Sequence, residues 1–388
     1  MTYDFDEIIE RRGTHCVKWD EIHDGDVLPM WVADMDFKAA PAIQAALRRR
    51  LEHGVFAYTI VENDYYDAIT NWYRHRHNWT IKRQWILYTT GVVPAVSAVI
   101  KALTLPGDQV IMQTPAYNCF FSSIRNCGCE MVENRLVKDD KGRYSIDFDD
   151  LERKCSSSRA RLLLLCNPHN PTGRLWSEDE LLCINDICRR YNVRVVSDEI
   201  HGELTFNGQR YVPFGRVSEE CMDNVVVCSS PSKAFNTAGL QMAHIICNNT
   251  EIRNRIDRVI NIHEICDVNP FAPEAVKAAY NDGEEWLDEL CSYVWGNYEL
   301  LCRFVNERMP MLRVSPLEAT YLAWIDITAL GLTSDECALR MMRDCKVWVS
   351  SGTIYGAAGE GFVRMNLATQ RSRVEEALRR IEKLKTER

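Results

Sequence analysis

The chain has 388 residues, a formal net charge of −9, 46% hydrophobic residues and 10% aromatic residues, as expected of a globular protein large enough for two domains. The negative charge argues against nucleic acid as a partner, because phosphates demand basic surfaces. No apolar run approaches about 18 residues, and the charged start MTYDFDEIIERR is unlike a signal peptide, so we expect no membrane span and a cytoplasmic location.

Short apolar runs alternate with helical patterns through the first part of the chain. Strands are predicted at 85–90, 110–113, 130–134, 162–166, 194–197, 225–228 and 244–247, and helices at 93–104, 178–191 and 251–263. The runs lack strict alternation, which is typical of strands buried on both faces of a mostly parallel sheet. Ser177 followed by Glu180 predicts a capping box. The pattern predicts an α/β layered domain with a seven-stranded sheet.

The character of the sequence changes after residue 282. A long helix is predicted over 286–309, then strands at 313–315, 321–327, 347–350 and 362–367, with helices at 334–344 and 371–385. This pattern indicates a smaller α+β unit. Residues 1–45 form no complete unit by themselves and are expected to pack with it. We therefore predict a large domain over 46–282 and a small domain made of 1–45 and 283–388.

Residues that follow the predicted strands are the first candidates for a site, because ligands bind at the carboxyl ends of parallel strands. Gly91-Val92-Val93 opens a helix whose free backbone N–H groups could hold a phosphate, although a simple turn explains the glycine equally well. Tyr117, in TPAYNCF, either stacks on a planar ligand or packs in the core.

The later strand ends carry an amide, a carboxylate and an amine. The loop NPHNPTG (167–173) is stiff and fixes the amide of Asn167 or Asn170 at the edge of the sheet. Asp198, in SDEIHGE, needs a partner if it is buried, unless it caps a helix. Lys233 lies among small residues in SSPSKAFNTAGL; considered alone, it could be a surface lysine.

Together these five strand ends match the needs of pyridoxal 5'-phosphate. The cofactor requires an amine for its Schiff base, a carboxylate for its ring nitrogen, a donor for its ring oxygen and a cradle for its phosphate. Small residues around Lys233 would let the cofactor approach the backbone, and burial would lower the pKa of the lysine so that it acts as nucleophile and base.

Three motifs, NPHNPTG, SDEIH and SPSKAFNTAGL, resemble the class I/II aminotransferase-like enzymes of fold type I over essentially the whole chain. MWVADMDF (30–37), FAYT (56–59) and AGLQ (238–241) resemble the MalY/PatB branch of C–S lyases, which are cystathionine β-lyases and cysteine desulfhydrases. The resemblance implies a pyridoxal-phosphate-dependent α,β-elimination of sulfur amino acids that yields thiol, pyruvate and ammonia. It also implies a homodimer with shared active sites.

The resemblance implies a role for each matching residue. Lys233 would be the Schiff-base lysine and Asp198 the partner of the pyridine nitrogen, with Asn170 and His201 near the ring oxygen and Tyr117 stacked on the ring. Val92, Val93 and Ser230 would hold the phosphate, Arg364 in GFVRMN the substrate carboxylate, and Tyr58 would reach the neighbouring subunit's site. Two positions depart from many relatives: His201 replaces a tyrosine, and Gln241 replaces a phosphate-binding arginine of many fold-type I enzymes.

Two other functions stay open at this point. An aminotransferase on the same scaffold would use the same residues, and a regulatory protein-binding role would make the lyase activity incidental. Trp31, Tyr58 and the loop 351–361 are expected to set the preference for the leaving thiol.

The sixteen cysteines show no metal or disulfide pattern. They contain no C-x-x-C pair, and the single C-x-C at 127–129 has no second half. We interpret them as reduced thiols. A zinc site with His75 and His77 is the alternative, but no four-ligand spacing supports it, and we expect no metal.

Overall fold

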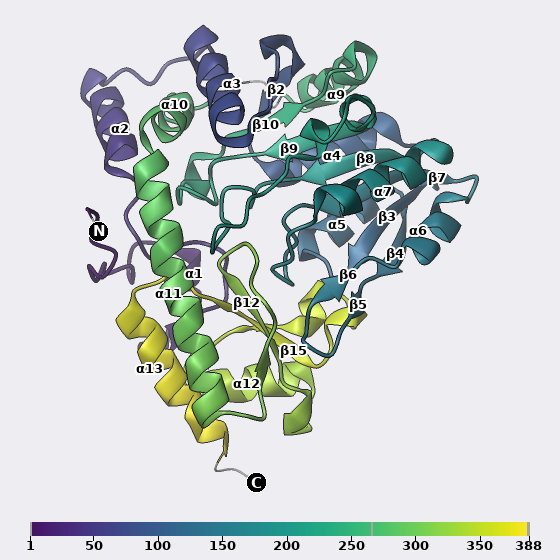
Figure 1. Cartoon of the computed structure of the whole chain (residues 1–388). Helices are drawn as coiled ribbons and strands as arrows, with labels where there is room; N and C mark the ends of the chain where they lie inside the picture. The colour runs from purple at the N-terminus through teal and green to yellow at the C-terminus, as the bar shows by residue number, and fades with distance from the viewer. Residues whose placement is uncertain (1, 265–266, 386–388) are drawn as a thin grey trace.

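The computed structural model describes residues 2–264 and 267–385, which form two principal sheets and the helices around them (Figure 1). The larger sheet has seven strands in the order β2-β10-β9-β8-β7-β3-β4. All are parallel except β10, which is antiparallel to both neighbours. The predicted seven-stranded, mostly parallel sheet is therefore confirmed. Its strands are β2 (Ile86–Thr89), β3 (Gln109–Thr114), β4 (Glu130–Arg135), β7 (Ala160–Cys166), β8 (Arg194–Asp198), β9 (Val225–Ser229) and β10 (Ala243–Ile246).

Helices cover both faces of this sheet. Adjacent residues of a strand face opposite cores: Val195 packs in one hydrophobic cluster and Val196 in the other, as the two-residue period of a strand requires. One face carries α4 (Val92–Leu103), α5 (Asn118–Asn126) and α9 (Thr250–Ile262), and the other carries α6 (Phe148–Cys155), α7 (Glu178–Arg190) and α8 (Glu219–Asn224). The predicted capping box at Ser177 and Glu180 is present at the start of α7.

The second sheet is antiparallel, with the order β11-β12-β15-β14. It lies below the larger sheet in Figure 1, next to the long helix α11, which continues from α10. Its elements are β11 (Arg313–Val314), β12 (Leu322–Asp326), β14 (Ser350–Ser351), β15 (Phe362–Asn366), α11 (Glu284–Arg308), α12 (Ser334–Arg343) and α13 (Arg371–Ile381). No helix in residues 2–264 and 267–385 could cross a membrane.

The single strand predicted over 347–350 is wrong. The chain forms two short strands there, because β13 (Val347–Trp348) pairs with the N-terminal β1 (Leu28–Pro29), whereas β14 pairs with β15. The N-terminal segment is thus hydrogen-bonded to the C-terminal part of the chain.

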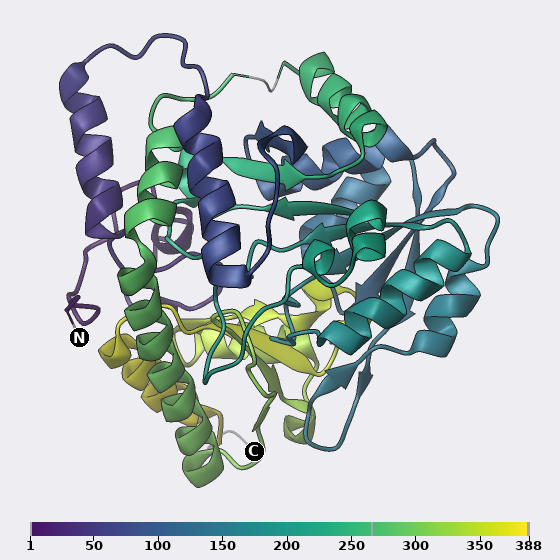
Figure 2. The ribbon, with the colours of Figure 1, turned by 45° about the horizontal axis from the view of Figure 1, so that its top comes forward.

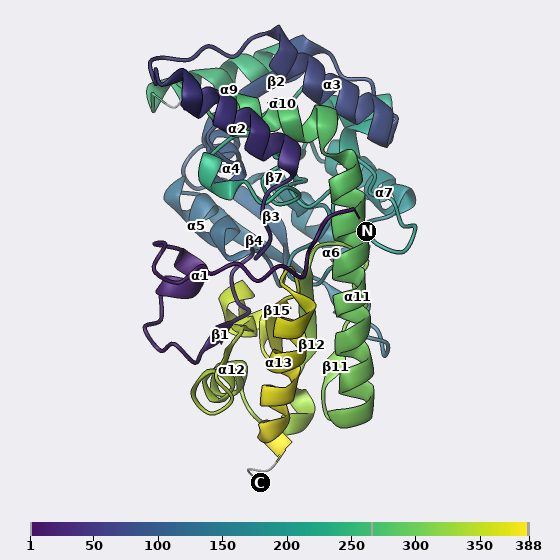
Figure 3. The same cartoon turned by 90° about the vertical axis from the view of Figure 1, so that its left-hand side faces the viewer.

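Several short or polar elements had no prediction. Helices α2 (Pro41–His53) and α3 (Asn63–His77) pack on α10 (Ala272–Asp282), at the top of Figure 3. Other elements without a prediction include α1 (Val17–Asp20), β5 (Val137–Lys138) and β6 (Tyr144–Ser145). All cysteines among the described residues are free thiols.

Candidate active site

A cavity of about 380 Å³ lies where the carboxyl ends of the parallel strands meet the second sheet. In Figure 2 the teal strands of the larger sheet lie above the yellow-green strands of the second sheet. The structure brings together at this cavity every residue to which the family resemblance assigned a role except Ser230 and Tyr58: Val92, Val93, Tyr117, Asn170, Asp198, His201, Lys233 and Arg364. These residues, which are up to 272 positions apart in the sequence, therefore line the same cavity.

The amine of Lys233 follows β9 and reaches into the cavity. Its Nζ donates a hydrogen bond to the carbonyl oxygen of Ala33 over 2.5 Å. Burial, together with the nearby guanidinium of Arg364, lowers the pKa of the Lys233 amine to about 8. An amine with this pKa is partly neutral near pH 7 to 8, so it can act as a nucleophile or a base.

The carboxylate of Asp198 ends β8 and is only 4% exposed. Its Oδ1 accepts one hydrogen bond, from the backbone N–H of Ile200 over 3.1 Å. Burial raises the pKa of the Asp198 carboxyl to about 7, against the opposing effects of that hydrogen bond and of Lys233. A cationic ligand beside this carboxylate would compensate the cost of burying its charge.

The start of α4 offers backbone donors at the other end of the cavity. Gly91 precedes the helix, and the N–H of Ala95 bonds to the Gly91 carbonyl to close the first turn. The N–H groups of Val92 and Val93 lie before that turn and have no acceptor within the helix. Both residues line the cavity. Free N–H groups and the helix dipole together favour an anion there.

Three buried polar atoms of the cavity walls have no hydrogen-bond partner in the described chain: Nδ1 of His201, the hydroxyl of Tyr355 and Nε of Arg364. Burial, with Lys233 and Arg364 nearby, holds the pKa of His201 well below its usual value, so the ring is neutral. Because buried polar groups are normally paired, these atoms indicate a polar ligand.

Two predicted residues lie elsewhere. The hydroxyl of Ser230 donates to the carbonyl of Met242 over 2.6 Å and accepts from the N–H of Ser232, so it is used within the loop. Ser232 lines the cavity in its place. Tyr58 is 96% exposed. Trp31, expected near the leaving group, does line the cavity.

Cys119 lines the cavity but was not among the predicted site residues, whereas Tyr355, which also lines it, lies in the loop 351–361 that was expected near the leaving thiol. Cys119 lies close enough to Tyr117 for its thiol to interact with the phenol group. In the motif TPAYNCF this cysteine stands two positions after the predicted tyrosine, on the first turn of α5. That closeness to Tyr117 is the sequence signal that could have indicated Cys119.

A larger hollow of about 670 Å³ surrounds Glu203 and contains no lysine. Several of its charged groups pair with neighbours: Glu203 accepts from Trp72 Nε1 and His77 Nε2, each over 2.7 Å, and pairs with Arg76. His75 pairs with Glu284. This hollow therefore lacks the amine that distinguishes the first cavity.

Comparison with known proteins gives the family. The aminotransferase class I and II family matches residues 26–381. The chain belongs to this family. One relative of this chain, the cystathionine beta-lyase PatB of Bacillus subtilis (strain 168), is 41% identical over 97% of this chain and 98% of its own length. Protein MalY of Escherichia coli (strain K12) is 33% identical over 97% of each chain.

Solved structures agree with this assignment. The pyridoxal-phosphate-bound C–S lyase from Staphylococcus hominis has a TM-score of 0.92 and 31% identity to this chain, and the alignment covers 99% of each chain. The resemblance to the MalY/PatB branch and the fold type I architecture are thus confirmed.

Proposed function

We propose that the chain is a pyridoxal-phosphate-dependent C–S lyase of the cystathionine β-lyase type. It eliminates the sulfur substituent of an amino acid and yields a thiol, pyruvate and ammonia. The observation that carries this proposal is the meeting of Lys233, Asp198 and Arg364 in one cavity, in a chain 41% identical to a named cystathionine beta-lyase.

The donor set of the cavity fits pyridoxal phosphate. Lys233 would hold the cofactor covalently, Asp198 would pair with the ring nitrogen, and the free N–H groups of Val92 and Val93 would take the phosphate. Tyr117 would stack on the ring, and Asn170 and His201 would face the ring oxygen. Ser230 would support the phosphate end through Ser232. When bound, the cofactor stabilises negative charge at the substrate α-carbon.

The chain's own groups supply the remaining steps. Arg364 binds the substrate carboxylate and fixes its orientation. The substrate amine would replace Lys233 on the cofactor, and the neutral amine of Lys233 released in this way would remove the α-proton, a general-base contribution of about 10²–10⁴-fold. The C–S bond at the β-carbon breaks and the thiolate leaves with the bonding electrons. Water converts the released enamine into pyruvate and ammonia.

We also propose that two chains form a homodimer in which Tyr58 completes the partner's site. The last turn of α2 and the segment between α2 and α3 carry exposed apolar side chains: Leu51 (59%), Val55 (55%), Phe56 (54%), Tyr58 (96%) and Ile60 (75%). Phe56 also packs against Phe271 with ring centroids 5.5 Å apart. Exposed apolar side chains that lie so close together in the chain favour a protein contact.

The predicted division into a large domain (46–282) and a small domain (1–45 with 283–388) belongs to this proposal, supported by the pairing of β1 with β13. A cytoplasmic location also belongs to it, because the cysteines of the described residues are free thiols, as in a reducing compartment.

The test supplies L-cystathionine or L-cysteine without any keto acid. Pyruvate and thiol released by the wild type, but not by Lys233→Ala, would support the lyase. Turnover that depends strictly on an added keto acid would assign an aminotransferase instead. Borohydride reduction of the loaded enzyme followed by peptide mapping should label Lys233, and a label elsewhere would contradict its assignment.

A further inference from the structure

The segment Trp31–Phe37, here called the strap, has no regular secondary structure, yet its carbonyl oxygens are all paired with side chains. Each of its seven carbonyl oxygens accepts a hydrogen bond from a side chain. The donors are Arg364 and Ser350 to residue 31, Asn366 to residues 32 and 34, Lys233 and Tyr321 to residue 33, Arg11 to residue 35, Gln370 to residue 36, and Asn236 to residues 35 and 37. Irregular buried backbone that is paired so fully is held in one conformation.

These donors come from both sides of the active site. Lys233 and Asn236 belong to the loop after β9, whereas Arg364 and Asn366 belong to β15 of the second sheet. Tyr321 directly precedes β12. The strap therefore connects the loop of the reactive amine to the strand of the carboxylate-binding arginine.

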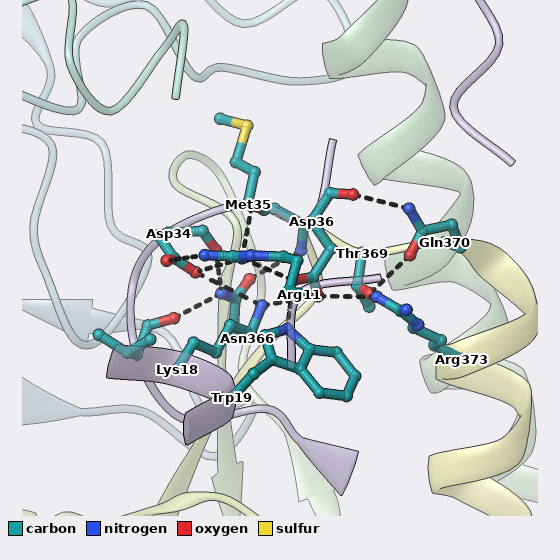
Figure 4. Close-up of polar contacts among 12 residues, drawn as sticks. Arg11, Lys18, Trp19, Asp34, Met35, Asp36, Asn366, Thr369, Gln370 and Arg373 are labelled. Carbon is teal, nitrogen blue, oxygen red and sulfur yellow. Dashed lines mark hydrogen bonds and ion pairs between the residues drawn. The ribbon is translucent and has the colours of Figure 1, made fainter. Parts of the chain in front are cut away.

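A cluster of charged side chains holds the part of the strap that contains Asp34 and Asp36. Figure 4 shows Arg11 beside the carboxylates of Asp34 and Asp36, with Lys18 and Trp19 nearby. Arg11 contacts Asp34 over 2.8 Å and Asp36 over 2.7 Å, and Lys18 contacts Asp36 over 2.8 Å. The side chains of Lys18 and Asp36 are 0% and 1% exposed. Moving Asp36 would separate it from Lys18, a pair of charges that water cannot reach.

The carbonyl of Ala33 is the point where this rigid segment meets the reactive amine. It accepts from Lys233 Nζ over 2.5 Å and from the Tyr321 hydroxyl over 3.0 Å. A neutral amine has two N–H bonds and one lone pair, so an acceptor that holds one N–H restricts where the lone pair points. A base must be oriented as well as deprotonated, since small misplacements of a reacting group are costly.

We propose, on the basis of the lyase function above, that the Ala33 carbonyl orients the free amine of Lys233 for proton removal and that Tyr321 is a positioning residue that fixes this carbonyl. Tyr321 acts through the strap and does not touch the reacting atoms. The strap thereby aligns the base with Arg364, whose Nη2 donates to the Trp31 carbonyl over 2.8 Å.

The test uses Tyr321→Phe, which removes the hydroxyl but keeps the ring that lies 6.0 Å from His201, edge to face. With L-cystathionine, kcat should fall about tenfold while KM changes less than about twofold, because orientation and not binding is lost. The isotope effect on kcat with α-deuterated substrate should rise, because proton removal becomes slower relative to the other steps. The matched control is Tyr298→Phe, whose hydroxyl also donates to a backbone carbonyl, that of Ser315, away from Lys233; it should behave as the wild type.

A second readout needs no activity. In cofactor-free protein, acetylation of Lys233 by acetic anhydride, measured by peptide mass spectrometry against the exposed Lys141, should be about threefold faster in Tyr321→Phe than in the wild type or Tyr298→Phe. Unchanged labelling together with an unchanged isotope effect would overturn the proposal, whatever happens to kcat. If the wild type releases no pyruvate, the lyase function fails, while the labelling still decides whether Tyr321 holds the amine.

Discussion

The guanidinium of Arg364 donates to Oδ1 of Asn170 over 3.0 Å, although 194 positions separate the two residues. Asn170 follows β7 of the large sheet and Arg364 lies in β15 of the second sheet, so this bond crosses the cavity between them. The partner is a neutral amide, and the described residues give Arg364 no ion pair. Its charge is therefore available to a substrate carboxylate.

Replacement of Arg364 by lysine should mainly weaken substrate binding. Lysine keeps the charge but loses the planar pair of donors that matches a carboxylate. We expect KM for L-cystathionine to rise about 10- to 100-fold, with a smaller change in kcat. Steady-state kinetics measures both, and Arg379→Lys, an exposed arginine on α13, is the control. An unaltered KM would place the carboxylate site elsewhere.

The site illustrates what the sequence can predict. Tyr117, Asn170, Asp198 and Lys233 meet because the carboxyl ends of parallel strands lie at one edge of the sheet. Their positions just after predicted strands were therefore enough to select them. Arg364 came only from family resemblance, because it lies in an antiparallel sheet whose placement over the first sheet is a tertiary fact.

Other features left no trace in the sequence. The acceptor for Lys233 is the backbone of Ala33, and a carbonyl carries no side-chain signature. Ser230 and Ser232 are equivalent in the pattern SSPS, and only the path of the loop decides which one faces the cavity. The two-residue strands β1 and β13 are too short for a periodic pattern, which explains the wrong prediction at 347–350.

Asp198 should contribute to turnover at a cost in stability. Asp198→Asn keeps the shape but removes the anion proposed to pair with the cofactor ring. We expect the variant to bind pyridoxal phosphate yet to lose about 100-fold or more in kcat. Cofactor absorbance and pyruvate release measure the two effects separately, and near-normal turnover would show that the ring needs no charged partner.

The same variant should stabilise the cofactor-free protein at high pH. The folded pKa of Asp198 is about 7, above its ordinary 3.8. As pH rises, the unfolded chain therefore releases this proton before the folded protein does. The free energy of unfolding falls by up to about 4 kcal/mol between pH 4 and 7 as a result. Urea unfolding at pH 8 should show a higher midpoint for Asp198→Asn than for the wild type, with the difference vanishing near pH 4. A lower midpoint at pH 8 would contradict this account.

Asp36 should show the opposite pH dependence. Burial opposes its ionisation, but Lys18, Trp19 and Arg11 outweigh burial and lower its pKa from 3.8 to about 2. Its stabilisation is therefore complete above pH 4 and is lost as pH falls toward 2. Asp36→Asn leaves Lys18 buried without a counter-charge. This change should lower the free energy of unfolding by about 3–5 kcal/mol at pH 7 and by less at pH 3.

Urea unfolding of Asp36→Asn at both pH values measures this difference. The matched control is Asp24→Asn, which removes the carboxylate of an exposed ion pair with Lys346 and should leave the midpoint unchanged. Equal losses for Asp36→Asn at pH 7 and pH 3 would indicate that packing, not charge, makes Asp36 important.

Mixing two inactive variants tests the shared site. If Tyr58 serves the partner's cavity, a dimer of one Lys233→Ala chain and one Tyr58→Ala chain has one site with both changes and one intact site. Random exchange makes about half of the dimers mixed, so about a quarter of wild-type activity should return.

The control for this experiment mixes Lys233→Ala with Asp198→Ala. Both of these residues line the cavity of a single chain, so no mixed dimer has an intact site and no activity should return. Recovery with Tyr58→Ala but not with Asp198→Ala requires that Tyr58, fully outside its own chain's cavity and 96% exposed, acts across the subunit boundary. If the first mixture shows only the summed residual activity of its two parents, each cavity works with its own Tyr58 or without it.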